Sequence, residues 1–181
     1  KTLIDKLAGS KYFSTLDLRS GFWNLKLTER SRDLLSFSVE TKQMRPLRLP
    51  MGLSVSPGIF QRIMMNIVGP FLDDFCQVYL DDCIIYSKTE ADHLKHISQV
   101  LEKFQDSGIL LNSTKCIFGK KVIKYLGFEI TSEGWRALPD RIEAIKNMPE
   151  PSDYKSLKRF IGAVSFLSGC VPGLQYKLGP L

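Results

Sequence analysis

The chain has 181 residues, of which 44% are hydrophobic and 24% are charged, so it is long enough to bury a core and is not disordered by composition. Its 25 Lys and Arg residues against 19 Asp and Glu give a formal charge of +6, which fits a polyanionic partner without proving one. No apolar run approaches the ~18 residues of a membrane span, and no signal-peptide pattern opens the chain.

The first predicted element is a strand from Phe13 to Leu16, which Asp17 ends. A tight turn is expected at Ser20 and Gly21, because glycine adopts the backbone angles that such turns require. A second apolar stretch follows the turn in the segment FWNLKL.

A hairpin is predicted within the basic and polar region 28–50, with LLSFSVE and MRPLRLP as its arms around TKQ. A loop marked by Gly and Pro then leads to a helix that should start near Ser56, with Pro57 at its first position. The expected core stripe of this helix is Ile59, Ile63 and Ile67.

The stretch CQVYLDDCIIYSK, residues 76–88, consists of two apolar runs separated by Asp81 and Asp82. This pattern predicts a β-hairpin, and a plain turn is the first interpretation because Asp is common in turns. Asp-Asp lacks the glycine that supplies the positive φ of a tight hairpin turn, however. A departure from local turn preferences often marks function, so both interpretations stay open at this point.

The next predicted element is an amphipathic helix in TEADHLKHISQVLEKFQDSG, which Gly108 closes. Its expected core stripe is Leu94, Ile97, Leu101 and Phe104. The segment LLNSTKCIFGKKVIKYLGFEIT should then form two or three short strands, with breaks at Gly119 and Gly127.

Two helices are predicted near the end of the chain. The first is short and is bounded by Pro139 and Pro149, and Ser152 should cap the second. The expected core stripe of that second helix is Leu157, Phe160, Ile161, Val164 and Leu167. Because helices and strands are mixed without regular alternation, the fold class is expected to be α+β with an antiparallel sheet backed by helices.

The four cysteines contain no CxxC pair, so neither a zinc site nor a disulfide framework is indicated. Reduced, buried thiols in an intracellular protein are expected instead. The first residue is Lys1 rather than Met, which suggests a fragment of something longer.

Three carboxylates are the candidate chemical centre. Asp17 at a strand end and the pair Asp81 and Asp82 in a hairpin can converge on one edge of a sheet, since neighbouring strands lie only ~5 Å apart. Crowded carboxylates repel one another unless a cation lies among them, and Mg²⁺ accepts such hard oxygen ligands. Two such ions can activate a hydroxyl and stabilise a leaving oxygen during displacement at phosphorus.

Five sequence blocks give the chain a family resemblance. STLDLRSGF, LPMGLSVSPGIFQRIM, VYLDD, GILLNSTKC and YLGFEIT stand in the order of the blocks of reverse transcriptases. VYLDDCIIYSK, followed by a helix and LNSTKC, is similar to the Ty3/gypsy type of long-terminal-repeat retrotransposon. The resemblance covers the chain from about Lys1 to Leu174, and it implies an RNA-directed DNA polymerase that adds deoxynucleotides to a primer 3′-hydroxyl.

The resemblance implies a catalytic role for four side chains. Asp17 and Asp81 would ligate two Mg²⁺ ions, for which Mn²⁺ is a possible substitute, and the backbone carbonyl of Leu18 would join them. Asp82 would be a supporting carboxylate of the metal site. Lys115 resembles the lysine proposed to protonate departing pyrophosphate, although a solvated surface charge is an equally good interpretation of a lone lysine.

The resemblance also implies nucleotide-binding and template-primer-binding residues. Phe22 would pack under the sugar and exclude a 2′-hydroxyl, whereas the alternative for such an aromatic is core packing. The expected nucleotide-binding residues are Phe22, Pro50, Met51, Gly52 and Leu80, the last with core packing as its alternative. The expected template-primer-binding residues are Tyr79, Leu126, Gly127, Lys158, Gly162 and Phe166. A mid-helix glycine such as Gly162 needs a reason, which is either close helix packing or close approach to a sugar edge.

By the same resemblance, residues 1–27 are palm, 28–50 a partial fingers hairpin, 51–136 palm with the primer-grip hairpin, and 137–181 the start of the thumb. The expected partners are an RNA or DNA template with its primer and deoxynucleoside triphosphates, without a membrane. Upstream fingers, ribonuclease H, protease and integrase of a Pol polyprotein would lie outside the chain, and the fragment alone should have little activity. The expected location is the cytoplasm or a virus-like particle.

A non-catalytic nucleic-acid-binding remnant of a retroelement is the alternative function, although a lost Asp would be its signature. A palm-type nucleotide cyclase is disfavoured, because its Gly-Gly-Asp/Glu-Glu-Phe hairpin is missing from the sequence.

Overall fold

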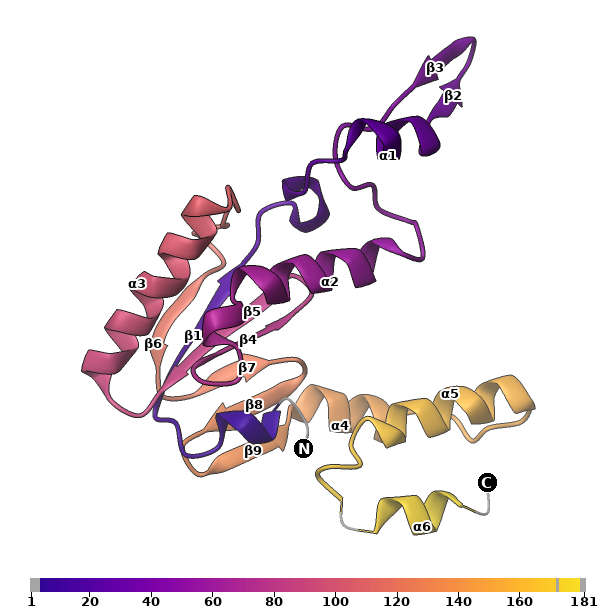
Figure 1. Ribbon diagram of the computed structural model, residues 1–181. Helices are drawn as coiled ribbons and strands as arrows, with labels where there is room; N and C mark the ends of the chain where they lie inside the picture. Colours follow the sequence, from indigo (N-terminus) through magenta and orange to yellow (C-terminus); the bar gives the residue numbers. More distant parts are fainter. Residues whose placement is uncertain (1–3, 172, 180–181) are drawn as a thin grey trace.

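The computed structural model describes residues 4–171 and 173–179. Its centre is a four-stranded antiparallel sheet in the order β4-β5-β1-β6 (Figure 1). The strands are β1 (Tyr12–Asp17), β4 (Cys76–Tyr79), β5 (Asp82–Ser87) and β6 (Ile117–Lys120). The predicted strand that ends at Asp17 and the predicted hairpin of residues 76–88 are therefore present, and the sheet is antiparallel as expected for an α+β protein.

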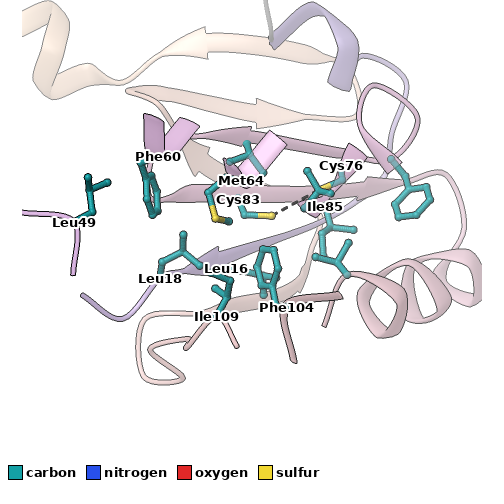
Figure 2. Close-up of a cluster of buried hydrophobic side chains, with 14 residues drawn as sticks. Leu16, Leu18, Leu49, Phe60, Met64, Cys76, Cys83, Ile85, Phe104 and Ile109 are labelled. Carbon is teal, nitrogen blue, oxygen red and sulfur yellow. Dashed lines mark hydrogen bonds between the residues drawn. The ribbon is translucent and has the colours of Figure 1, made fainter. Parts of the chain in front are cut away.

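Two helices, α2 (Ser56–Ile67) and α3 (Glu90–Asp106), cover one face of this sheet. Figure 2 shows the resulting core, in which Phe60 of α2 and Phe104 of α3 gather around Leu16 and Ile85 of the strands. Burial of this apolar surface holds both helices against the sheet. The cluster ends near the Asp17 end of β1, so it forms the rigid support behind the carboxylates.

The buried stripe of α2 lies one residue later than predicted. Phe60 and Met64 are fully buried, whereas Ile59, Ile63 and Ile67 are only partly buried. The pattern IFQRIMMNI is apolar over a wide arc, so spacing alone does not decide which edge of that arc meets the sheet. Ser56 begins the helix as predicted, and Pro57 is its second residue.

In α3 the predicted Phe104 is buried and Gly108, with φ of 67°, follows the helix end as expected. Leu94 was wrongly assigned to the core and is 64% exposed, because His93 takes the inward position in that turn. Polar partners explain the choice of His93: Ser14 Oγ lies 2.7 Å from its Nε2, and Ser87 Oγ lies 2.8 Å from its Nδ1. Ser87 Oγ also lies 2.8 Å from Nδ1 of His96, so both histidines of the chain belong to this one network.

A second, three-stranded sheet packs on part of the opposite face. It consists of β7 (Ile123–Tyr125), β8 (Phe128–Thr131) and β9 (Gly134–Ala137), and the short helix η1 (Ile4–Leu7) joins it. Its apolar side chains meet Phe13, Ile84 and Tyr86 of the central sheet. The strands β6, β7 and β8 agree with the predicted short strands, whereas β9 was not predicted.

The predicted hairpin within residues 28–50 is present as β2 (Phe37–Val39) and β3 (Lys42–Met44), and it projects from the rest of the molecule (Figure 1). Its turn is Glu40-Thr41 rather than TKQ, and Glu40 has φ of 53°. Two short helices, η2 (Gly21–Asn24) and α1 (Glu29–Leu34), precede it and were not predicted. Five of the six residues of α1 are polar and offer no apolar periodicity. The Thr28 side chain starts this helix by accepting a hydrogen bond from the Ser31 amide.

The remaining helices are η3 (Gly69–Phe71), α4 (Pro139–Lys146), α5 (Tyr154–Ser165) and α6 (Leu174–Leu178). Asp153, not the predicted Ser152, caps α5, because its carboxylate accepts from the Ser156 amide while Ser156 Oγ accepts from the Asp153 amide. The predicted core stripe of α5 is only half-buried. The helix contacts α4 and α6, and the residues that directly follow it, Phe166 and Leu167, reach the three-stranded sheet.

The cysteines are free thiols, and Cys76 and Cys83 are buried with their sulfur atoms 3.6 Å apart, as drawn in Figure 2. Burial was correctly predicted for these two, whereas Cys116 and Cys170 are only partly buried. Within residues 4–171 and 173–179, none of the helices has the length and apolar character needed to cross a bilayer.

Candidate active site

Asp17 is the last residue of β1 and Asp82 is the first residue of β5, so the two lie at the same end of neighbouring strands. Asp17 of β1 is the direct antiparallel partner of Asp82 of β5, which in turn is the partner of Tyr79 of β4. Directly paired residues project to the same face of a sheet, so both carboxylates lie on the face opposite the α2 and α3 core. The three-stranded sheet packs on the same face through Phe13, Ile84 and Tyr86.

Asp81 lies in the tight turn that joins β4 to β5. The turn residues are Leu80 and Asp81, so the expected Asp81-Asp82 turn is one residue out of register, and Asp82 belongs to the strand. Leu80 has φ of 53°, a left-handed conformation that costs about 1 kcal/mol for a residue with a side chain. The turn therefore exists without the glycine that usually supplies such a conformation.

Gln61 of α2 holds this turn. Its Nε2 donates to the Val78 carbonyl at 2.9 Å, and its Oε1 accepts from the Leu80 amide at 2.6 Å. Because β4 is an edge strand, these two backbone groups have no strand beside them, and the glutamine amide takes the place of one. The side chain thus fixes the conformation of the turn that carries Asp81.

The carboxylates influence one another electrostatically. Burial raises the pKa of Asp81, and the charges of Asp82 and Asp17 raise it further. The pKa of Asp82 is raised by burial and by the charge of Asp17. A cation between these groups would relieve both effects, and carboxylate and carbonyl oxygens are the donors that Mg²⁺ prefers.

The described part of the chain holds no ready-made set of three or more His, Cys, Asp or Glu ligands. Asp17, Asp81 and Asp82 are therefore not placed as a three-carboxylate metal site, and a Mg²⁺ ion held there would need substrate phosphates and water among its ligands. Gly21 is packed against Asp81 in this arrangement: a Cβ atom at position 21 would lie 2.0 Å from Asp81 Oδ1. The glycine therefore leaves room for the carboxylate beside the loop that follows β1.

Four of the five predicted nucleotide-binding residues lie in two segments, η2 and the residues before α2, and the fifth, Leu80, lies in the turn itself. Phe22, in η2, is half-buried, and its ring centroid lies 5.0 Å from that of the buried Phe60. Residues 50–52 precede α2, where the Pro50 carbonyl accepts a 2.7 Å hydrogen bond from Ser56 Oγ. Met51 is 58% exposed and Gly52 has φ of 89°, so this loop presents its side chains and backbone outward.

Lys115 lies in an exposed turn after α3. The turn is attached to the carboxylate strand, because the Asn112 amide donates to the Asp17 carbonyl at 2.9 Å and the Lys115 amide donates to the Asn112 carbonyl at 3.0 Å. The exposed amine fits both interpretations offered above, a proton donor and a surface charge.

The predicted primer-side hairpin, the turn Leu126-Gly127 between β7 and β8, faces Asp82. Both turn residues have positive φ, 48° and 83°. Together with Thr15, Asp82, Lys124 and Tyr125, they line a small cavity of about 250 Å³. The Tyr125 hydroxyl donates to the Asp82 carbonyl at 3.3 Å, and burial raises the pKa of this phenol well above its ordinary value.

Lys158, Gly162 and Phe166 follow one another at four-residue spacing along α5. Phe166 packs on the predicted primer-side hairpin, because its ring stacks on Phe128 with centroids 4.9 Å apart. A Cβ atom at position 127 would lie 3.1 Å from this ring. Lys158 and Gly162 are exposed, and no atom lies within 4 Å of where a Cβ of Gly162 would be. Close helix packing therefore does not explain this glycine among the described residues.

Three residues of the site were missed by sequence reasoning: Gln61, Tyr125 and Asn24. Gln61 directly follows the buried Phe60, and a polar side chain beside a buried stripe was the available signal. Tyr125 is the first residue of the YLGF block, whose turn alone was considered. Asn24 gave no signal in the sequence, although its Nδ2 bonds the Arg19 and Gly21 carbonyls of its own loop, and its Oδ1 accepts from the distant Leu110 amide.

Comparison with protein families matches residues 1–130 to the model described as "Reverse transcriptase (RNA-dependent DNA polymerase)". The chain is 35% identical over 164 residues to the Retrovirus-related Pol polyprotein from transposon gypsy and 36% over 170 residues to that from transposon 297, both of Drosophila melanogaster. It is 29% identical over 179 residues to the Transposon Tf2-3 polyprotein of Schizosaccharomyces pombe. These alignments cover 91%, 94% and 99% of the chain, but the chain spans only 16%, 16% and 13% of those relatives.

Solved structures give the same result. The foamy viral protease-reverse transcriptase in complex with double-stranded DNA superimposes with a TM-score of 0.86 at 28% identity, covering 98% of this chain and 31% of that one. A complex of the foamy viral protein with an RNA/DNA hybrid has a TM-score of 0.80 at 27% identity, covering 99% and 25%. The predicted α+β fold is thereby confirmed. With the family model matching more than half of its length, the chain belongs to the reverse transcriptase (RNA-dependent DNA polymerase) family.

Proposed function

We propose that the chain is the central part of an RNA-directed DNA polymerase that adds deoxynucleotides to a primer 3′-hydroxyl. One observation carries the proposal: Asp17 and Asp82 are paired at the open end of the central sheet, and the adjoining turn presents Asp81 beside them. Membership of the reverse transcriptase family supports the same chemistry. All three carboxylates are intact, which disfavours a non-catalytic remnant.

Each carboxylate has its own part in the proposed site. Asp17 and Asp81, with the backbone carbonyl of Leu18, would hold two Mg²⁺ ions, and Mn²⁺ could replace them. Bound there, the ions would activate the primer hydroxyl and stabilise the leaving oxygen. Asp82 supports the site by its charge, and its backbone is held by Tyr125. Lys115, on the turn attached to Asp17, would deliver a proton to pyrophosphate.

The loops around the carboxylates would position the substrates. Phe22, supported by Phe60, would lie under the sugar of the incoming nucleotide, and Leu80 against its base or the primer end. Other proposed nucleotide contacts are Pro50, Met51 and Gly52. The proposed primer and template contacts are Tyr79, Leu126, Gly127, Lys158, Gly162 and Phe166. Holding reactants in a reactive geometry is a major source of rate in such chemistry.

We propose the subdomains that the family resemblance implies: palm at 1–27 and 51–136, a fingers hairpin at 28–50, and the start of the thumb at 137–181. Residues 1–3, 172 and 180–181 lie outside the described part. Related proteins are Pol polyproteins, and foamy viral relatives are solved with double-stranded DNA and with an RNA/DNA hybrid. We propose a template-primer duplex and deoxynucleoside triphosphates as partners here, within a longer polyprotein.

The test uses the natural reading frame that contains this chain, expressed as a whole polymerase. Deoxythymidine incorporation on poly(A)/oligo(dT) should be detectable with Mg²⁺ and absent in the Asp81→Asn variant. The variant should remain folded, because the exchange removes a repelled charge and keeps the side-chain shape. Asp106→Asn, at the exposed end of α3, is the matched control and should keep full activity. An inactive natural protein that still binds the duplex would favour the non-catalytic alternative.

A further inference from the structure

The loop between Arg19 and Asn24 carries the proposed gate residue Phe22 and is closed by one side chain. Asn24 Nδ2 donates to the Arg19 carbonyl at 2.8 Å and to the Gly21 carbonyl at 3.1 Å. The two carbonyls flank Ser20, which has φ of 57° and so is held in a left-handed conformation. The Asn24 amide thus stabilises a turn that the local sequence does not favour.

The same side chain also attaches the loop to a distant segment. Asn24 Oδ1 accepts from the Leu110 amide at 3.1 Å, beside the backbone bond from the Arg19 amide to the Leu110 carbonyl at 2.8 Å. Arg48, at the base of the projecting hairpin, donates from Nη1 to the Asn24 carbonyl at 2.9 Å. Asn24 therefore connects the Arg19–Asn24 loop, the segment after α3 and the base of the hairpin.

Only an amide of this length satisfies all of these partners. Two N–H groups face two carbonyls and one oxygen faces one N–H, which also fixes the orientation of the amide. A carboxylate in the same place would face the Arg19 and Gly21 carbonyls without a proton to donate. Such a substitution leaves the volume of the side chain unchanged while removing the bonds that close the loop.

We propose that Asn24 is a positioning residue for sugar selection: by closing the Arg19–Asn24 loop, it holds Phe22 against Phe60 and so keeps ribonucleotides out. The inference rests on the proposed polymerase function and adds a determinant to it. Phe22 alone supplies the bulk, but a bulky group discriminates only when it cannot move aside. Loss of the Asn24 amide bonds frees the loop while Phe22 itself stays intact.

The test compares Asn24→Asp and Asn24→Ala with the wild type in the whole polymerase. We expect the ratio of kcat/KM for deoxynucleotides to that for ribonucleotides to fall about tenfold or more. The free energy of roughly one hydrogen bond corresponds to a tenfold change in this ratio, and the substitutions remove the bonds that close the loop. Asn66→Asp is the matched control, because it makes the same exchange at an exposed position near the end of α2 that has no part in the proposed site. This control should keep the wild-type ratio.

The outcomes are distinguishable. A lower ratio in both Asn24 variants, with the ratio of Asn66→Asp unchanged, supports the inference, and Asn24→Ala carries the test alone if Asn24→Asp does not fold. Equal loss of deoxynucleotide and ribonucleotide incorporation, with an unchanged ratio, shows that Asn24 is merely structural and overturns the inference while leaving the polymerase assignment in place. A wild-type polymerase without any incorporation refutes the proposed function and this inference together.

Discussion

The strained turn that carries Asp81 should depend on Gln61. The substitution Gln61→Met keeps the length and helix preference of the side chain but removes both of its hydrogen bonds, to the Val78 carbonyl at 2.9 Å and from the Leu80 amide at 2.6 Å. The Val78 carbonyl lies on the edge strand β4 and the Leu80 amide in the turn after it, so no neighbouring strand replaces the lost partners. At about 0.5–1.5 kcal/mol for each bond, the free energy of unfolding should fall by about 1–3 kcal/mol.

This loss is measurable in the isolated chain. For a protein of this size, each kcal/mol lowers the melting temperature by about 2–4 °C, so thermal and urea unfolding should both detect it. Gln105→Met is the control. It makes the same exchange at an exposed position of another α-helix, α3, and should leave the free energy of unfolding unchanged. In the whole polymerase, displacement of Asp81 by about 1 Å is enough to lower the rate on the order of a hundredfold.

A second substitution tests the reasoning about strain. Leu80→Gly relieves the left-handed φ of 53°, so the additional loss from Gln61→Met should be smaller in the Leu80→Gly background than in the wild type. The account of the turn would be refuted by a Gln61→Met variant with wild-type stability, or by the same loss in Gln105→Met. Perfectly additive effects of Gln61→Met and Leu80→Gly would show that the glutamine does not hold the strained residue.

Three other perturbations have defined outcomes. Burial lowers the folded-state pKa of His93 and His96, so the unfolded chain binds protons first as the pH falls. The free energy of unfolding, measured with urea, should be full above the ordinary histidine pKa of about 6.5 and should decrease below it. The double variant His93→Gln with His96→Gln should show a weaker dependence on pH. Phe22→Val should raise kcat/KM for ribonucleotides relative to deoxynucleotides, whereas a lower melting temperature with unchanged selectivity would assign Phe22 to the core. Gly162→Ala should raise the free energy of unfolding by about 1 kcal/mol, since open space surrounds the glycine. The same substitution should weaken binding to a template-primer duplex, and unchanged binding would show that α5 does not contact the duplex at Gly162.

The sequence by itself determined the elements with strong local signals. Short apolar runs bounded by turn residues indicated β1 and the β4–β5 hairpin, and the amphipathic pattern indicated α3 with its closing Gly108. The family resemblance of five short blocks was also available without a structure, and the family is confirmed. Short polar elements such as α1 gave no signal, because their helices depend on capping and on the chain around them.

Only the tertiary structure decided how the carboxylates are held. Strand register made Asp17 the partner of Asp82 and moved the turn to Leu80-Asp81, although the residues themselves allowed an Asp81-Asp82 turn. Local preferences do not place a left-handed leucine in a turn, because the hydrogen bonds that stabilise it come from Gln61 on a helix 19 residues away in the chain. A pattern within one segment predicts that segment, whereas the position of a functional side chain depends on partners that only folding brings together.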